Sequence, residues 1–285
     1  LQTVLGVHRD RQVLHYQRET FVRWWARRSA GRKVGTGKKA ALFAGCLVNY
    51  QATDVGKATV QVLEKNGVEV ALPDQSCCGM PSFDIGDTAA MVAAAERTIA
   101  SLKSWVDQGY DVVIPTPSCS LMVKREYVSL VAGDEAKRVA EHTYDISEYL
   151  MKMKREGGLA MDFTQKPGRV AYQVPCHLRD QNIGFKSKEL MECAGAKVEV
   201  IEKCSGHDGS WSAKVEFFPL SMKIAQKAVR MVEQAPADLV ASDCPLAGLQ
   251  LDQAGAVAHA GGRSSQHPIQ IVRDAYGLPR DPRAS

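Results

Sequence analysis

Residues 39–46 read Lys-Ala-Ala-Leu-Phe-Ala-Gly-Cys, a short apolar run that ends at a cysteine. An apolar run of this length indicates a buried β-strand. The same arrangement returns in residues 169–176, Arg-Val-Ala-Tyr-Gln-Val-Pro-Cys, where a second apolar run ends at a cysteine. Each stretch therefore predicts a strand that carries a thiol, Cys46 or Cys176, at its carboxyl end.

The cysteines around these two strands form a pattern that occurs twice. The first copy is Cys46, Cys77-Cys78-Gly79 and Cys119, and the second copy is Cys176, Cys204-Ser205-Gly206 and Cys244. Corresponding positions in the two copies lie 130, 127 and 125 residues apart. A near-constant offset over three landmarks indicates two related halves, each of which gathers its cysteines at one place.

Strands and helices alternate in both halves. Hydrophobic periodicity predicts strands over 39–45, 68–72, 111–114, 169–174, 197–201 and 238–241, and helices over 54–65, 88–108, 188–194 and 215–234. This alternation is typical of parallel sheets covered by helices on both faces, so we predict an α/β fold with two pseudo-repeated, Rossmann-like halves. Ligands of such folds bind outside the carboxyl ends of the strands. Every patterned cysteine follows a strand, and we therefore expect a metal site there in each half.

The sequence divides into three parts. We expect a basic, aromatic N-terminal arm over residues 1–38, a first cysteine-rich domain over 39–153 and a second over 168–277. Hydrophobic residues make up 45% of the 285 residues and charged residues 24%, as in a soluble globular protein. Because the sequence has neither an apolar run long enough to span a membrane nor a secretory signal, we expect a cytoplasmic protein with reduced cysteines. It does not begin with Met, which suggests a trimmed or excerpted chain.

The net charge of +4 is concentrated near the arm. Residues 23–39 hold seven Lys or Arg and no acid, close to Phe21, Trp24 and Trp25. A basic segment with aromatic residues is suited to docking on an anionic membrane surface or on a partner. In the alternative interpretation, the Trp side chains pack on the body of the protein. Outside these seven residues the chain has 29 basic and 32 acidic residues, which does not favour nucleic-acid binding.

The adjacent pair Cys77-Cys78 favours an iron–sulfur cluster in the first half. Neighbouring Cα atoms are about 3.8 Å apart and their side chains point apart, so a disulfide between them would be strained. A single tetrahedral zinc usually takes ligand pairs with two or more residues between them. Different irons of one cluster can each take one thiolate. The candidate cluster ligands are Cys46, Cys77, Cys78 and Cys119, and inert buried thiols are the alternative.

The second half differs in its chemistry. Ser205 stands where the first half has a thiol, and His177 and His207 lie near the cysteines in sequence. A set of three sulfurs and one nitrogen is common at zinc sites. A mixed-ligand iron–sulfur cluster and the loss of metal from this half are the alternatives. The candidate metal ligands are Cys176, Cys204, His207 and Cys244.

These motifs resemble the duplicated cysteine-rich domain that is named after its Cys-Cys-Gly motif. This family includes the B subunit of heterodisulfide reductase and iron–sulfur subunits of glycolate oxidase and lactate utilisation, and the sequence is most similar to the C subunit of anaerobic glycerol-3-phosphate dehydrogenase. The resemblance covers residues 3–275 and is carried by residues 44–50, 77–81, 117–122, 175–179, 204–209, 216–218 and 243–248. The heterodisulfide reductase relatives end the motif in Cys-x-x-Cys, whereas residues 116–119 read Thr-Pro-Ser-Cys, so one cysteine of that pattern is absent.

The resemblance implies an electron-transfer component of an oxidoreductase complex. It implies a 4Fe–4S cluster at the first site, and zinc or a second iron–sulfur cluster at the second. The expected partners are a flavoprotein dehydrogenase of the glycerol-3-phosphate type and a ferredoxin-like domain, whose motifs this sequence lacks. Electrons would pass towards quinone, with peripheral contact on the inner face of the cell membrane. The alternatives are a zinc-stabilised scaffold or binding module and thiol–disulfide catalysis of the heterodisulfide reductase kind.

Overall fold

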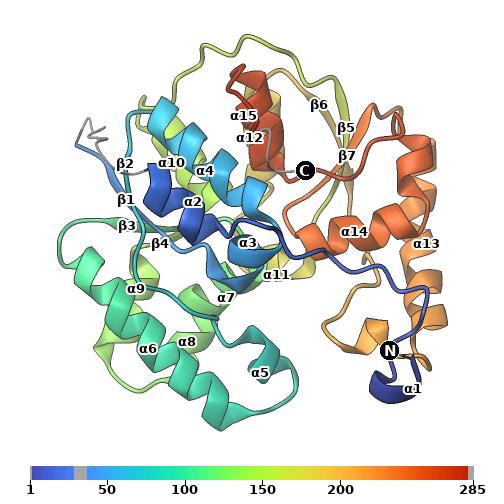
Figure 1. Cartoon of the computed structure of the whole chain (residues 1–285). Coiled ribbons are helices and arrows are strands. Elements are labelled where there is room, and N and C mark those ends of the chain that lie inside the picture. The colour runs from blue at the N-terminus through green and yellow to red at the C-terminus, as the bar shows by residue number, and fades with distance from the viewer. Residues whose placement is uncertain (1, 29–36, 282–285) are drawn as a thin grey trace.

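The computed structural model describes residues 2–28 and 37–281 (Figure 1). The strands are β1 Lys39–Leu42, β2 Glu69–Ala71, β3 Asp111–Ile114, β4 Thr143–Asp145, β5 Arg169–Gln173, β6 Lys197–Ile201 and β7 Leu239–Ser242. The helices up to the link between the halves are α1 Gln2–Leu5, α2 Phe21–Arg28, α3 Gly45–Tyr50, α4 Thr53–Lys65, α5 Met80–Asp84, α6 Thr88–Val106, α7 Pro117–Leu121, α8 Tyr127–Leu130, α9 Asp134–Glu141 and α10 Ile146–Arg155. Those after it are α11 Cys176–Arg179, α12 Lys186–Cys193, α13 Phe218–Gln234, α14 Pro245–Gln253 and α15 Pro268–Ala275.

The strands form two parallel sheets, one in each half. The first has the order β2-β1-β3-β4 and the second the order β6-β5-β7. In both sheets the strand that opens the half lies between the two strands that follow it, and all neighbouring pairs are parallel. The predicted α/β fold with two Rossmann-like halves is therefore confirmed. The strand β4, which periodicity did not predict, extends only the first sheet.

The central strand β1 shows why these residues form a parallel sheet. Ala40, Ala41 and Leu42 are completely buried, because helices cover both faces of the sheet. A strand that is buried on both faces is apolar throughout rather than alternating. The apolar run before Cys46 therefore lies in the middle of a sheet that is covered on both sides.

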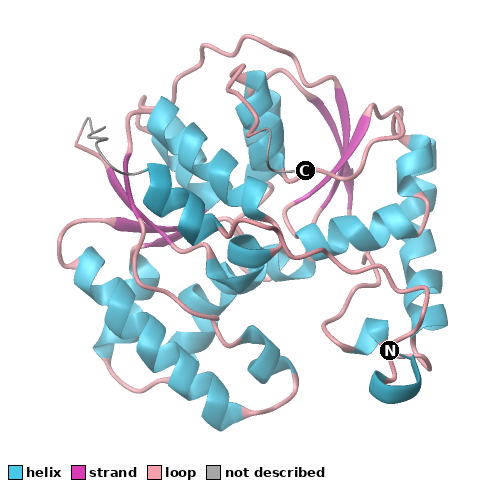
Figure 2. Cartoon of the chain, in the orientation of Figure 1, coloured by secondary structure: helices cyan, strands magenta, loops and turns pink. Residues whose placement is uncertain are grey.

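The two halves share one hydrophobic core. Helices α4 and α10 from the first half and α12 and α15 from the second lie between the two sheets (Figures 1 and 2). Val62 and Leu150 from the first half belong to the same buried cluster as Leu190 and Val272 from the second. Helices α6 and α9 cover the other face of the first sheet, and α13 and α14 cover the other face of the second.

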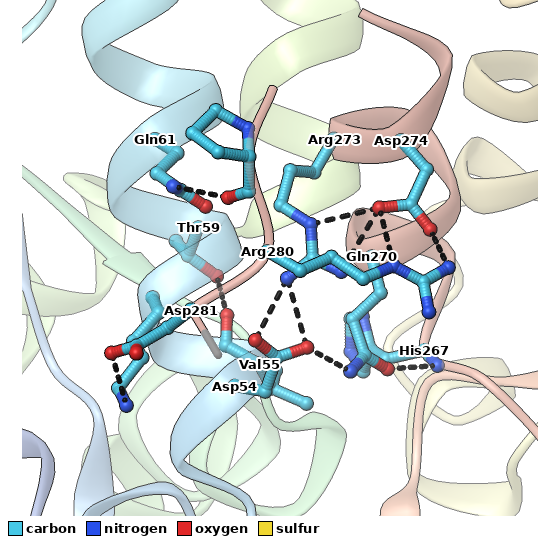
Figure 3. Close-up of polar contacts among 12 residues, drawn as sticks. Asp54, Val55, Thr59, Gln61, His267, Gln270, Arg273, Asp274, Arg280 and Asp281 are labelled. Carbon is cyan, nitrogen blue, oxygen red and sulfur yellow. Dashed lines mark hydrogen bonds and ion pairs between the residues drawn. The ribbon is translucent and has the colours of Figure 1, made fainter. Parts of the chain in front are cut away.

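A buried ion pair joins the halves at the contact between α4 and α15 (Figure 3). Nη1 of Arg273, a residue that is only 1% exposed, lies 2.8 Å from both carboxylate oxygens of Asp54. Gln270 donates a further hydrogen bond of 2.7 Å to the same carboxylate. His267 begins α15 by accepting a hydrogen bond from the Ile269 backbone, and its Nε2 lies 2.8 Å from the Pro115 carbonyl oxygen of the first half. Polar contacts therefore fix α15 against the first half.

The N-terminal arm begins on the second half. Val7 forms an isolated antiparallel bridge with Lys214. The backbone N–H of His8 donates to the Ala213 carbonyl oxygen at 2.8 Å, and the His8 ring stacks on Phe218 with 4.1 Å between centroids. This part of the arm lies beside the segment that follows Cys204.

The arm continues onto the first half. Gln17 donates from its backbone to the Tyr50 carbonyl oxygen at 2.8 Å. Farther along, Phe21 and Trp24 are buried in the shared core, and Trp25 packs against it. Phe21 and the two Trp side chains of the arm therefore pack on the body of the protein, as in the second of the two interpretations of its sequence. The basic residues at 32 and 33 lie outside the described residues.

In the described ranges, 2–28 and 37–281, no helix combines the length and the apolar character needed to cross a membrane.

Candidate metal-binding sites

The fold brings the four cysteines of the first half to one end of one sheet. Cys46 lies in α3 directly after β1, Cys77 and Cys78 lie between β2 and α5, and Cys119 lies in α7 after β3. Because β2, β1 and β3 are parallel neighbours, their carboxyl ends meet at the same edge. The predicted convergence of these cysteines follows directly from the strand order.

The thiols of the first site meet in pairs. The Sγ atoms of Cys46 and Cys77 lie 3.9 Å apart, far beyond the disulfide bond length of about 2.05 Å. Two thiolates on one tetrahedral metal atom, each at about 2.3 Å, lie roughly 3.8 Å apart. The two thiols are therefore not cross-linked, and they lie close enough together to bind metal at one site. Cys78 in turn contacts both Cys77 and Cys119.

Hydrogen bonding among the thiols divides them into proton donors and acceptors. Donation from Cys46 and Cys78 lowers the pKa of the Cys77 thiol well below its usual value. The pKa of Cys46 is raised, first by its hydrogen bond to Cys77 and then by burial. Cys119 accepts from Cys78, and this lowers its pKa. Thiolate formation at Cys77 and Cys119 is therefore favoured, and thiolates are the form that binds metal.

Backbone geometry at two glycines makes room for these thiols. Gly45 has a φ of +68°, and a Cβ atom there would lie 3.0 Å from the Cys119 Sγ atom. Gly79, which follows the adjacent pair, has a φ of +86°, and its Cβ would lie 3.2 Å from the Ala94 Cβ. Side chains other than hydrogen are disfavoured at such φ values. The glycines of the Gly-Cys and Cys-Cys-Gly sequences thus allow the backbone to pass close to the thiols of the site.

Two polar side chains hold the loops of the first site. The Gln75 side-chain oxygen accepts from the backbone N–H groups of Ala44 at 2.6 Å and Gly45 at 3.0 Å. The buried Tyr127 hydroxyl donates to the Cys78 carbonyl oxygen at 2.7 Å. These contacts fix the backbone on either side of the thiols. Sequence reasoning missed both residues, although Gln75 lies only two positions before Cys77.

The second half repeats this placement with three cysteines. Cys176 begins α11 after β5, Cys204 follows β6, and Cys244 caps α14 after β7. The Cys176 and Cys204 thiols are exposed and Cys244 is partly buried. Donation from Cys204, aided by the nearby Arg179 guanidinium, lowers the pKa of Cys176 to about 5. Burial raises the pKa of Cys244.

The structure places His207 beside the arm. Its Nδ1 atom lies 3.0 Å from Nη2 of Arg11 and 3.5 Å from the Ser212 hydroxyl oxygen. Burial, followed by the charge of Arg11, lowers the pKa of His207 to about 4, so the ring is neutral at physiological pH. His177 lines a shallow depression together with Cys176, Arg179 and Asp180. Sequence reasoning missed Arg11 because 196 residues separate it from His207.

The donor chemistry fits a cluster better than a single ion. The first site holds four thiols in consecutive contact, two of them adjacent in sequence. Soft thiolates favour zinc, copper(I) and iron–sulfur clusters, and only a cluster gives adjacent thiolates separate metal atoms. The residues of the first site therefore fit an iron–sulfur cluster.

The two sites lie on the same side of the contact between the halves. The Gln181 amide nitrogen donates to the Ser120 hydroxyl at 2.8 Å, next to Cys119, and to the His177 carbonyl oxygen at 3.1 Å, next to Cys176. One buried side chain thus links α7 to α11, the helices that carry a cysteine of each site. Nothing in the sequence around Gln181 signals this role.

The same two halves are recognisable in known proteins. Residues 40–124 and 170–252 each match the CCG cysteine-rich domain, so the match covers more than half of the chain. The chain belongs to this family. Lactate utilization protein A of Geobacillus thermodenitrificans is 31% identical over 255 residues, which cover 84% of this chain and 98% of that protein. The resemblance to the duplicated Cys-Cys-Gly domain is therefore confirmed.

Two further relatives extend the comparison. The C subunit of anaerobic glycerol-3-phosphate dehydrogenase from Escherichia coli is 27% identical over 279 residues, which cover 96% of this chain and 68% of that protein. A crystal structure of a hypothetical protein from Helicobacter pylori is similar with a TM-score of 0.51 and 12% identity. The match covers 96% of this CCG-domain chain and 53% of the Helicobacter protein, and this likeness supports the fold alone.

Proposed function

We propose that this CCG-domain protein is the iron–sulfur electron-transfer component of an oxidoreductase complex. The observation that carries the proposal is the set of four thiols, Cys46, Cys77, Cys78 and Cys119, gathered at the carboxyl ends of three neighbouring strands. A bound iron–sulfur cluster, of the 4Fe–4S type in our proposal, supplies one-electron redox chemistry at this point. The four cysteines would hold the cluster, with Cys78 and Cys119 in buried positions and Cys46 and Cys77 partly exposed.

The experiment that tests the proposal is a metal and sulfide analysis of protein purified without oxygen. We expect about four irons with acid-labile sulfide at the first site and a reducible electron paramagnetic resonance signal. The Cys78→Ser variant should lose this signal, because it lacks one thiolate of the adjacent pair. Cys193→Ser is the matched control, since Cys193 lies at the end of α12, outside the repeated pattern.

The outcomes separate the proposal from its alternatives. Persistence of the signal in Cys78→Ser would contradict the ligand assignment. Zinc alone, with no visible absorption under anaerobic handling, would contradict electron transfer and favour a zinc-stabilised scaffold. A thiol-dependent activity without a partner dehydrogenase would favour thiol–disulfide catalysis.

We further propose a flavoprotein dehydrogenase of the glycerol-3-phosphate type as the electron donor, with a ferredoxin-like domain as a partner and quinone as the acceptor. The support is the similarity to the C subunit of the Escherichia coli dehydrogenase. The similarity to lactate utilization protein A makes a lactate-linked donor the second candidate. The rate of cluster reduction by each dehydrogenase with its own substrate distinguishes them, and a faster rate with the lactate-linked enzyme would overturn the first assignment.

At the second site we propose that Cys176, Cys204 and Cys244 hold zinc or a second iron–sulfur cluster; the sequence adds His207 as a candidate fourth ligand. We also propose that the chain divides into domains at 39–153 and 168–277. A further part of the proposal is peripheral contact with the inner face of the cell membrane. The arm offers little support for membrane contact, because Phe21 and Trp24 are buried. Metal analysis of a Cys244→Ser variant tests the second site.

A further inference from the structure

Arg11 of the N-terminal arm contacts His207, three residues after Cys204 of the second site. Its guanidinium donates through Nη1 to the side-chain oxygen of Gln250 and approaches the Nδ1 atom of His207 at 3.0 Å through Nη2. The arm precedes the first half in sequence, yet it supplies a charged group to the second. The hydrogen bond from Gln12 to Gln253 in α14 holds the arm at this position.

The chemistry of the two groups settles the direction of the Arg11–His207 hydrogen bond. A guanidinium has only donors and keeps its charge in proteins. A neutral imidazole carries one N–H and one acceptor nitrogen. Because the nitrogen that faces Arg11 must accept, the proton of neutral His207 resides on Nε2. A histidine that coordinates metal through Nε2 needs the opposite tautomer, with the proton on Nδ1.

Arg11 is also connected to the backbone of the cysteine loop. Gln250, which accepts from Arg11, is completely buried and donates to the Ser221 hydroxyl at 3.0 Å. The Ser221 hydroxyl donates to the Gly206 carbonyl oxygen at 2.7 Å, and the Gly206 N–H donates to the Cys204 Sγ atom at 3.3 Å. The arm and the Cys204 loop therefore belong to one hydrogen-bonded network.

We infer that Arg11 is a positioning residue of the second site. Arg11 holds His207 as an Nε2–H donor, and the site is left with thiolate ligands only. The inference rests on the proposed function for the identity of the site, but the state of the His207 ring does not depend on bound iron. It refines the ligand set predicted from sequence, because three thiolates then leave a fourth coordination position for a ligand from outside the chain. Coordination by the Nε2 atom of His207 would place an Nδ1–H against the guanidinium.

Nitrogen-15 NMR of the histidine rings tests this inference directly. The full chain is labelled, depleted of metal with a chelator, and then supplied with zinc alone; a His207→Gln variant assigns the signals. We expect the proton of His207 on Nε2 in both states. A proton on Nδ1 in the wild-type protein, or zinc bound at Nε2, would overturn the inference.

Variants at position 11 add a readout that a purely structural role would not change. In Arg11→Met we expect the ratio of Nε2–H to Nδ1–H to fall by at least about tenfold, or about 1.4 kcal/mol, because a charge-assisted hydrogen bond is lost. Arg11→Lys should restore the wild-type ratio, since an ammonium group also only donates. The control is Arg9→Met, at an exposed position on the same arm. An unchanged ratio in a folded Arg11→Met protein would contradict the role of Arg11.

These results stay separate from the test of the proposed function. If the first site held no iron, the proposal of electron transfer would be contradicted, but the tautomer of His207 could still be measured. If the proton of His207 were found on Nδ1, the iron and sulfide content expected at the first site would be unaffected. Each proposal therefore fails on its own observation.

Discussion

Replacement of Asp145 by Asn should change how the stability of the protein depends on pH. Asp145 caps α10 by accepting from the Ser147 N–H at 2.9 Å through Oδ1, while its buried Oδ2 atom has no hydrogen-bond partner among the described residues. Burial, and then the nearby Asp243 carboxylate, raise the pKa of Asp145 to about 8. The folded protein therefore keeps a proton at neutral pH that the unfolded chain releases.

The sign and size of the effect follow from this difference. An unfolded Asp ionises near a pKa of about 3.9, so between about pH 4 and pH 8 only the folded state holds the proton. Its stability then falls as the pH rises, with a slope of about 1.4 kcal/mol per pH unit for this one group. From pH 4 to pH 7 the loss is at most about 4 kcal/mol. The asparagine side chain of the variant cannot ionise and remains a good N-cap, so the variant avoids this loss.

Urea unfolding at pH 5, 6 and 7 measures the effect. We expect the free energy of unfolding of Asp145→Asn to rise relative to the wild type by about 1 kcal/mol or more per pH unit over this range. The matched control is Asp87→Asn, which makes the same chemical change at the exposed N-cap of α6 and should show no such trend. A difference between wild type and Asp145→Asn that stays constant from pH 5 to pH 7 would refute the reasoning.

Two further substitutions test the packing of the halves and of the second site. Arg273→Met should lower the free energy of unfolding by about 3 kcal/mol, because it leaves the partly buried Asp54 carboxylate without its cation; Arg280→Met, at an exposed ion pair with Asp274, should cost less than about 1 kcal/mol, and equal losses would contradict a role for burial. Gly206→Ala should destabilise the second site, since its Cβ would lie 2.3 Å from the Ser221 carbonyl oxygen at a φ of +78°. Gly86 has nearly the same φ but open space around its Cβ. Gly86→Ala should therefore lower the free energy of unfolding only by the conformational cost of about 1–2 kcal/mol. Thermal unfolding of both variants distinguishes the clash from the backbone strain.

The sequence correctly predicted the strands that end near the cysteines, because the apolar run and the cysteine lie within a few residues of each other. The apolar run at residues 40–44 specifies a doubly buried strand, and the repeat of the cysteine pattern places equivalent strands in equivalent positions. Convergence of Cys46 with Cys77 and Cys119 then requires only that neighbouring parallel strands end at one edge. These inferences need no knowledge of contacts between the halves.

Contacts between distant segments could not be predicted in this way. The strand β4 is only three residues long, Thr143–Asp145, and its sequence Thr-Tyr-Asp has no apolar run that would indicate a strand. The network of Arg11 depends on residues 196 and 239 positions away, and nothing in the sequence of the arm signals either contact. The unusual environment of Asp145 arises from burial against the second half. In each case the position of the residue is set by the packing of the two halves, which hydrophobic periodicity does not encode.

The shared core between the sheets also has a consequence for how the protein could be dissected. Leu190, Ile269 and Val272 of the second half are completely buried in the same cluster as Val60 and Leu63 of the first. A polypeptide cut between residues 156 and 168 and expressed as two pieces would expose this apolar surface on both fragments. We expect the separated fragments to aggregate alone and to recover native structure only when they are mixed during refolding. Although the chain is a tandem repeat in sequence, we expect its two copies to unfold together in one cooperative transition.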